Sequence, residues 1–297
     1  MKVIKKGYQG VLILFTLILM LHVGCSSDKE FKFTFNRQDG ETYVQKLSIS
    51  RERLTGADSM EMEDTLLETR VTCRKIIEGW DIESQTLNTI MMKNGEEIQS
   101  PLFALISKLT ITYRIDSSGN MKDLIGYDRV LEAVKSQYPP EVAENVSAGI
   151  NIDAIRQREF SEWKNRVGDF LGKKFSIGDT WEHDASYILP NGDKISYRVK
   201  TLFKEKVQQN SVTCVLIEQT YDSAGDGLTV KDDKHPELDQ ESASINGMVT
   251  RIIDPATMRI YKEEVKREIH MSTEMPITGK IPEEIVETRT YDYEYGR

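Results

Sequence analysis

The sequence has few of the features that mark fibrous, low-complexity or membrane-embedded proteins. Among 297 residues there are 8 prolines and 19 glycines, too few for a collagen-like or low-complexity chain. Only one long apolar run occurs, near the N-terminus, whereas a multi-pass membrane protein needs several runs of about 20 residues. Acids outnumber bases by 48 to 39, and the formal net charge is −9. A nucleic-acid partner is therefore not expected, because binding a phosphate backbone needs a basic surface.

Sequence motifs for catalysis are also missing. The chain contains no Gly-x-Ser-x-Gly elbow, no phosphate-binding glycine loop and no pair of histidines four residues apart. Isolated histidines lack the partner groups that catalysis needs, so His183, His235 and His270 are each expected at the surface. We therefore predict no catalytic residue and no cofactor. The alternative is a hydrolase whose carboxylate or metal site is built from dispersed residues.

An acidic stretch at residues 222–241 is the best candidate for a metal site. Calcium prefers clustered oxygen ligands. The stretch lacks the spacing of a calcium loop, and Lys231 and Lys234 interrupt its negative charge. A solvated hairpin loop is the favoured interpretation, and no metal ligand is predicted. The acids of this stretch are Asp222, Asp226, Asp232, Asp233, Glu237, Asp239 and Glu241.

Cysteine is scarce, with three residues at Cys25, Cys73 and Cys214. No Cys-x-x-Cys spacing exists, which argues against a zinc ribbon or a thioredoxin-type site. In an oxidising compartment Cys73 and Cys214 could form a disulfide. The alternative is that both are buried free thiols, and this is favoured because a sequence does not show whether two Cα atoms approach within about 7 Å.

The first 24 residues differ from the rest of the chain. Lys2, Lys5 and Lys6 precede an apolar run from Val11 to Leu21, and Gly24, Cys25 and a polar stretch follow. A positive start, a short apolar run and a small residue before a break are typical of a secretory signal peptide. The alternative, a transmembrane anchor, is less favoured because the run is too short to cross a bilayer.

This segment resembles a bacterial lipoprotein signal peptide, in which Gly or Ala precedes an invariant cysteine. Gly24 and Cys25 match that motif, Val23 is acceptable before them, and His22 stands where the family usually has Leu. The resemblance implies a signal peptide at 1–24, acylation of Cys25 and a lipidated tether at 25–30. It also implies a membrane partner, and Ser26 favours the outer membrane of the cell envelope. Loss of the three signal lysines changes the charge from −9 to −12.

Beyond the tether, the pattern predicts strands at 42–50, 68–79, 81–92 and 107–116. Residues 51–67 are charged and are expected to form a loop or hairpin. Asn94-Gly95 predicts a tight hairpin turn, and residues 117–120 predict another turn. Further strands are predicted at 179–188, 194–206, 211–221, 243–254, 257–271 and 285–295. Charges on both faces of 261–271 indicate a strand that is mostly solvent-exposed or lines a shallow surface. Tyr291, Tyr293 and Tyr295 share one face of the last strand, which packs onto a core or, alternatively, lines a groove.

Between these two groups of strands the periodicity becomes helical, from 126 to 172. The pattern predicts a first helix that ends at Pro139-Pro140, a second at 141–149 and a third at 152–171. The third has an apolar stripe, which most often packs on a sheet. Its members are Ile152, Ile155, Phe160, Trp163, Val167, Phe170 and Leu171.

Short internal repeats suggest that the two groups of strands are related. Gly40-Glu41-Thr42-Tyr43 resembles Gly178-Asp179-Thr180-Trp181, and Ile115-Asp116 resembles Ile253-Asp254 at the same offset. Thr72-Cys73 and Thr213-Cys214 match with a small gap. We predict an α+β fold with two related antiparallel β-sheet halves and a helical insert packed on one face. The expected units are 31–175, which includes the helices, and 176–297.

The layout is loosely similar to the lipid- and lipoprotein-carrier group of the bacterial envelope, in which helices cover a curved antiparallel sheet. It also resembles uncharacterised secreted lipoproteins with a Gly-Asp-x-Trp motif, here Gly178 to Trp181. The resemblance transfers no site residues. It implies a lipid-anchored envelope lipoprotein with a non-catalytic binding or structural role, which could hold an apolar ligand between sheet and helices.

Overall fold

The computed structural model describes most of the chain from residue 30 onward. The described residues are 30–56, 59–99, 104–105, 107–148, 150–189, 192, 194–223, 240–275 and 279–296. The signal peptide, Cys25 and most of the tether therefore lie outside the described residues.

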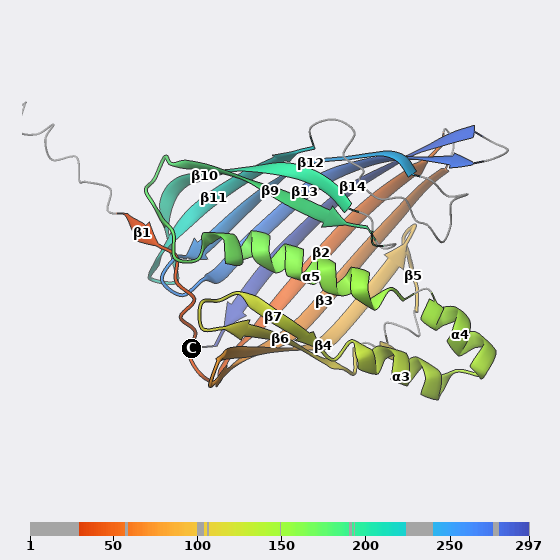
Figure 1. Ribbon diagram of the computed structural model, residues 1–297, viewed down its shortest axis with the longest axis horizontal. Helices are drawn as coiled ribbons and strands as arrows, with labels where there is room; N and C mark the ends of the chain where they lie inside the picture. Colours follow the sequence, from red (N-terminus) through yellow and green to blue (C-terminus); the bar gives the residue numbers. More distant parts are fainter. Residues whose placement is uncertain are drawn as a thin grey trace, which may run out of the picture.

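One large antiparallel sheet dominates the described fold (Figure 1). Its strand order is β7-β6-β4-β3-β2-β14-β13-β12-β11-β10-β9, and β5 pairs with β4. The sheet is continuous because β14 pairs with β2 from Tyr295↔Tyr43 to Glu283↔Thr55. The first strands are β2 (Glu41–Thr55), β3 (Ser59–Ile76), β4 (Gly79–Lys93), β5 (Glu96–Glu97), β6 (Thr110–Asp116) and β7 (Met121–Ile125). The later strands are β9 (Thr180–Ile188), β10 (Lys194–Gln209), β11 (Val212–Asp222), β12 (Gln240–Asp254), β13 (Arg259–Met275) and β14 (Gly279–Tyr295).

The predicted strands and the Asn94-Gly95 hairpin are present. Asn94 and Gly95 both have positive φ, 51° and 83°, as a tight two-residue turn requires. Of the loop or hairpin expected at 51–67, the structure has the hairpin: β2 runs on to Thr55, β3 begins at Ser59, and the two strands pair across these residues. Charged side chains there pair across the strands, as Arg51 does with Glu63 at 3.5 Å, so their charge does not disfavour a strand.

Three helices follow β7. They are α3 (Asp128–Gln137), α4 (Pro140–Ala148) and α5 (Ile152–Arg166). Asn151 caps α5 by accepting a hydrogen bond from the Ala154 amide at 2.9 Å. The third helix is shorter than predicted, since it ends at Arg166 and a 3-10 turn, η1 (Gly168–Phe170), follows.

Helix α5 lies across the concave face of the curved sheet and contacts both of its edge strands, β7 and β9 (Figure 1). The Trp163 indole donates to the Gly119 carbonyl at 2.9 Å, next to β7. The Ser161 hydroxyl donates to the Ser186 carbonyl of β9 at 2.7 Å. The helix therefore spans the open side of the trough that the sheet forms. The prediction of a large antiparallel sheet with a helical insert on one face is confirmed.

An aromatic cluster closes one end of the trough. Phe33, Phe170 and Phe203 are fully buried there, and their ring centroids lie 5.3–6.2 Å apart. In the stretch from Phe31 to Phe35 only β1 (Phe31–Lys32) is a strand, and it pairs with β8 (Lys174–Phe175). This cluster ties the start of the described chain to the end of the helical insert.

Candidate functional site

Strand β13 carries buried charges on its inner face. Glu263 and Arg267 are only 2% and 8% exposed, whereas Lys262 and Lys266 on the other face are exposed. The prediction that 261–271 is mostly solvent-exposed was therefore wrong. A buried charge is tolerated where it is paired and hydrogen-bonded, so the partners of these residues decide what the inner face can do.

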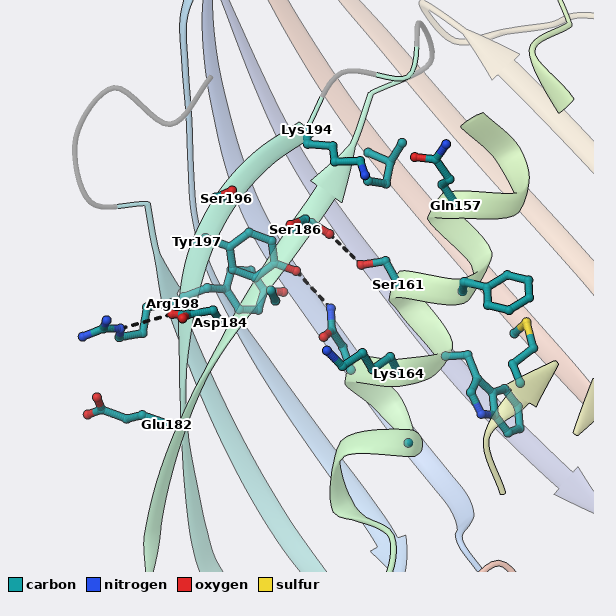
Figure 2. A pocket seen from close by; sticks show the side chains of 18 of the residues that line it. Gln157, Ser161, Lys164, Glu182, Asp184, Ser186, Lys194, Ser196, Tyr197 and Arg198 are labelled. Atoms are coloured by element: carbon teal, nitrogen blue, oxygen red, sulfur yellow. Dashed lines mark hydrogen bonds and ion pairs between the residues drawn. The ribbon is translucent and has the colours of Figure 1, made fainter. Parts of the chain in front are cut away.

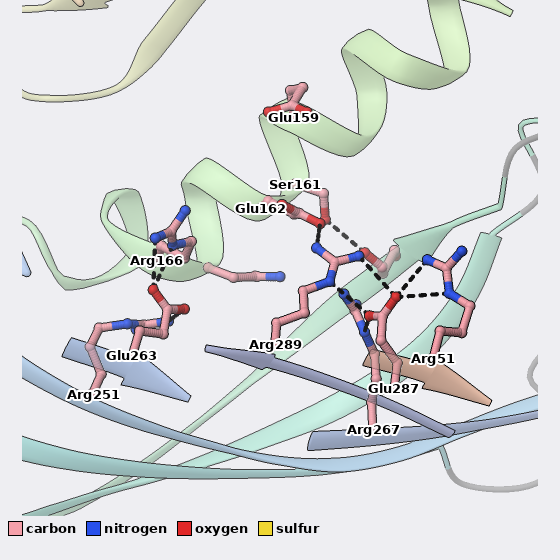
Figure 3. A network of polar contacts seen from close by, with 12 residues as sticks. Arg51, Glu159, Ser161, Glu162, Arg166, Arg251, Glu263, Arg267, Glu287 and Arg289 are labelled. Atoms are coloured by element: carbon pink, nitrogen blue, oxygen red, sulfur yellow. Dashed lines mark hydrogen bonds and ion pairs between the residues drawn. The ribbon is translucent and has the colours of Figure 1, made fainter. Parts of the chain in front are cut away.

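Glu263 lies between two arginines. Arg166 of α5 donates to Glu263 Oε2 at 2.7 Å, and Arg251 of β12 donates to Oε1 at 2.9 Å (Figure 3). Burial would raise the Glu263 pKa, but Arg166 and Arg251 overcome it and lower that pKa to about 2. Glu263 is thus ionised at neutral pH and joins α5 to the sheet.

Glu287 of β14 is held by three arginines. Arg51 Nη2 lies 2.6 Å from Oε2, and Arg267 Nε and Arg289 Nε lie 2.5 and 2.8 Å from Oε1. These cations keep the Glu287 pKa far below its usual range despite burial. Arg289 also lies 3.5 Å from Glu162 of α5. Figure 3 shows both networks beneath the helix.

The second network continues as a row across the sheet. In register from β13 to β4, the successive partners are Arg267, Glu287, Arg51, Glu63 and Lys93. The sign of the charge alternates at each strand, so every side chain has opposite charges beside it. Opposite charges directly across strands stabilise a sheet, which favours this register.

A cavity of about 470 Å³ lies between α5 and the inner face of the sheet. Apolar side chains of β2, β3, β4 and β6 form one wall, including Leu47, Leu67, Val71, Ile82 and Ile111. Six tyrosines line it as well: Tyr43, Tyr113, Tyr127, Tyr291, Tyr293 and Tyr295. The predicted row of tyrosines on the last strand therefore borders this cavity. Its volume falls in the range of about 300–1,000 Å³ that is typical of small-molecule sites.

The polar groups of the cavity gather on α5. Arg158, Glu159, Glu162 and Arg166 all line it. Tyr113 donates to Glu159 Oε2 at 3.2 Å. Burial, reinforced by the nearby charge of Glu162, raises the Glu159 pKa to about 7. A carboxyl group that titrates near neutral pH inside a cavity is a functional-site candidate.

A second, wider groove of about 1500 Å³ runs along the other side of α5, beside β9 and β10. Figure 2 shows Ser161 bonded to the β9 backbone, and Asn165 donates to the Tyr197 hydroxyl at 3.2 Å. Its labelled lining is mostly polar and charged, and Asp184 already pairs with Arg198 at 3.5 Å. The smaller cavity has the apolar walls and the perturbed carboxyl group, so it is the stronger candidate.

The two cysteines of the body are buried free thiols in this structure. Cys73 lies on β3 and Cys214 on β11, and β2, β14, β13 and β12 lie between those strands. Burial raises the pKa of Cys73 to about 11 and that of Cys214 to about 12. The third predicted site residue, Cys25, lies outside the described residues.

The histidines do not all lie at the surface. The His183 side chain is only 10% exposed, it stacks on Trp181 with ring centroids 4.4 Å apart, and Asp169 lies 3.4 Å from its Nε2. Its expected surface position was wrong, because the helical insert packs over β9 at this point. His270 is half-exposed, with 45% of its side chain accessible. His235 lies outside the described residues.

Two features are absent from the described part of the chain. No group of three or more His, Cys, Asp or Glu side chains there could hold a metal ion. The acidic stretch 222–241 falls mostly outside that part, which lacks residues 224–239. Where the structure describes the chain, no helix is long and apolar enough to span a bilayer.

Sequence reasoning missed the cavity residues on α5. Arg158, Glu159 and Glu162 lie between the apolar positions of a predicted amphipathic helix and read as its solvated face. A signal was present, because Arg158, Glu159 and Glu162 follow the stripe residue Ile155 by three, four and seven positions, which places them on its face of the helix. A stripe interrupted by charge is typical of a helix with polar groups turned inward.

Comparisons with known proteins give little guidance. No family model matches the chain, and no curated protein matches it. Among solved structures, lipovitellin, described for its lipid–protein interactions, has a TM-score of 0.44 and 11% identity over 87% of this chain. The chain spans 25% of the lipovitellin chain. A candidate exported protein with a YmcC-like fold from Bacteroides fragilis has a TM-score of 0.24 and 9% identity, covering 86% of this chain and 97% of that chain. Such low scores do not carry function from either protein.

Proposed function

We propose that this protein is a lipid-anchored lipoprotein of the cell envelope that holds an apolar ligand between α5 and the sheet. The observation that carries the binding role is the cavity of about 470 Å³, with an apolar wall from four strands and polar groups on the helix. A fully packed core would leave no such space, because protein interiors contain few voids larger than a water molecule.

The ligand is expected to copurify with the protein. Native mass spectrometry of protein purified without detergent should show an added mass that organic extraction removes. Extraction of the same sample should yield one class of lipid. Protein that carries no added mass, and that binds no apolar probe after extraction, would contradict the binding role.

The anchor is proposed from the N-terminal sequence alone. Cys25 would become the acylated first residue, and several acyl chains hold a protein stably where one chain does not. Ser26 favours the outer membrane. Radiolabelled palmitate should enter the wild type and Cys73→Ala but not Cys25→Ala. An unlabelled wild type would overturn the anchor and leave the ligand proposal untouched.

A hydrolase is the second candidate, favoured by the Glu159 pKa of about 7, which suits a general acid or base. A two-carboxylate mechanism needs a second free acid in the cavity. The nearest on the helix, Glu162, is engaged by Arg289. Turnover of an ester or glycoside that Glu159→Gln abolishes, with unchanged ligand binding, would establish the hydrolase instead.

We also propose that the two runs of strands, β2 to β7 and β9 to β13, arose by duplication. Gly40 and Gly178 precede the first strand of each run, and their amides donate to the Cys73 and Phe203 carbonyls at 2.8 and 2.7 Å. By this correspondence Cys73 matches Phe203, so the Thr-Cys repeat does not belong to it. Superposing the two runs should bring Gly40 onto Gly178 and Asp116 onto Asp254 together, and failure of either would contradict the duplication.

A further inference from the structure

The arginines that line the cavity differ in whether a carboxylate of the protein pairs with them. Arg37 pairs with Glu41 at 2.8 Å, Arg166 pairs with Glu263 at 2.7 Å, and Arg289 lies 2.8 Å from Glu287. These three arginines are therefore held by protein carboxylates. They have little remaining capacity to bind a ligand strongly.

Arg158 is different. It lines the cavity, and among the described residues it donates no hydrogen bond and forms no ion pair. Its charge partly offsets the rise that burial causes in the pKa of Glu159 and of Tyr127, so the three groups lie near one another in the cavity lining. A guanidinium presents five N–H donors in a fork that fits an acidic oxygen pair. A ligand acid would supply the missing partner.

We infer that the cavity ligand is a single-chain amphiphile whose acidic headgroup binds Arg158 while its chain lies along the apolar wall of the sheet. This inference rests on the proposed binding function and names the class of ligand. The volume of about 470 Å³ lies near the lower end of the usual range for ligand sites, which suits one acyl chain better than a bulky diacyl lipid.

Glu159 makes this binding depend on pH. The charged groups that face it are Arg158, Glu162 and Arg166 of the same helix, and Tyr113 and Tyr127 approach from β6 and from the start of α3. When Glu159 is ionised, its charge repels an anionic headgroup beside Arg158. When it is protonated, it can donate a hydrogen bond to that headgroup. Because its pKa is about 7, affinity is highest below neutral pH and falls as the pH rises.

The experiment uses competition against a neutral apolar fluorophore, N-phenyl-1-naphthylamine. The protein used in this experiment begins at Ser26, so that it lacks the signal peptide and Cys25 and retains every described residue. The competitors are 1-dodecanesulfonate and 1-dodecanol below their micelle concentrations. The sulfonate keeps its charge from pH 5.5 to 8.5, so a pH effect on its affinity must arise in the protein.

The wild type is expected to bind the sulfonate at least about tenfold more tightly than the alcohol at pH 6, the scale of a charge-assisted hydrogen bond. Between pH 6 and 8.5 the sulfonate affinity should fall about tenfold, which corresponds to a one-unit shift of the Glu159 pKa on binding. The alcohol affinity should change little over that range.

Three variants separate the contributions. Arg158→Gln should lose the preference for the sulfonate and still bind the alcohol. Glu159→Gln should bind the sulfonate with no dependence on pH. Arg156→Gln is the matched control, because Arg156 lies on the same helix, pairs with Asp128 and lines the other groove. It should behave as the wild type.

The possible outcomes separate failure of this inference from failure of the proposed binding function. Equal binding of sulfonate and alcohol by the wild type would overturn the acidic headgroup while the apolar site stands. An unchanged preference in Arg158→Gln would also overturn it. Binding of neither competitor, with no binding of the fluorophore, would overturn the proposed function as well.

Discussion

Arg166, Glu263 and Arg251 form a charged triad that links three elements across the trough. Desolvation of such groups is expensive, and the attraction between them repays it only with close contacts and further hydrogen bonds. Here both Glu263 oxygens are engaged, and Arg166 also donates to the Tyr293 hydroxyl. The triad therefore fixes where α5 sits more than it adds net stability.

Removing the Glu263 charge should destabilise the protein and change its response to acid. Glu263→Gln leaves Arg251 buried without its anion, at an expected cost of about 3–5 kcal/mol at pH 7. The folded pKa of Glu263, about 2, is below its ordinary value of 4.5. The stability that follows from this shift, about 3 kcal/mol, is present above pH 4.5 and is lost as the pH falls toward 2.

Urea unfolding of the chain from Ser26 at pH 7, 4 and 3 measures this effect. The difference in free energy of unfolding between wild type and Glu263→Gln should narrow as the pH falls. Glu264→Gln is the control, since Glu264 is 41% exposed on the opposite face of the same strand. A difference that stays constant with pH would mean that Glu263 is not held by the arginines.

At the scale of elements, strands were predictable wherever alternation or turn residues were clear. The alternation along β9 to β14 and the Asn94-Gly95 turn located most of them. At 51–67 the sequence did not decide between a loop and a hairpin, because charged residues have low strand propensity and the pairing of Arg51 with Glu63 is visible only in the structure. The prediction that residues 261–271 of β13 are exposed was wrong for the same reason. The burial of charged residues on the inner face of β13 can be predicted only when their partners on α5 and β14 are known.

One close approach between strands can be tested with a methyl group. Gly247 of β12 faces inward, and a Cβ there would lie 2.4 Å from Tyr221 Cε2 and 2.5 Å from the Lys266 carbonyl. Because the carbonyl belongs to the backbone of β13, the strands would have to move. Gly247→Ala should lower the free energy of unfolding by about 1–3 kcal/mol, the usual cost of overpacking.

Thermal and urea unfolding of Gly247→Ala should both report this loss. The neighbouring Met248→Ala serves as control, because Met248 is 42% exposed on the outer face and should change stability by less than about 0.5 kcal/mol. Equal free energies of unfolding for the two variants would show that β12 and β13 can move apart at this position without a loss of stability.

At the scale of the whole molecule, the sequence predicted the components of the cavity better than the cavity itself. An amphipathic helix over an antiparallel sheet was expected, and so was a shared face for Tyr291, Tyr293 and Tyr295. The space between them was not predictable, because it depends on how far the sheet curves and on whether α5 sits on the inner face or at its rim. Trp163 and Ser161 set that height through hydrogen bonds to backbone carbonyls far away in sequence.

Filling the cavity should separate ligand binding from folding. Ser84 of β4 is a small residue on the cavity wall, and Ser84→Trp would place a large apolar group in the space proposed for the acyl chain. Because the space is already present, the indole need not displace the core. We expect at least a tenfold loss of affinity for N-phenyl-1-naphthylamine and dodecanesulfonate, about 1.4 kcal/mol, with an unfolding midpoint close to that of the wild type.

Gln85→Trp is the control, because Gln85 is an exposed neighbour on the opposite face of the strand, and it should bind both molecules normally. Retained binding in a folded Ser84→Trp would place the ligand outside this cavity, and the wide groove beside β9 would become the site to test.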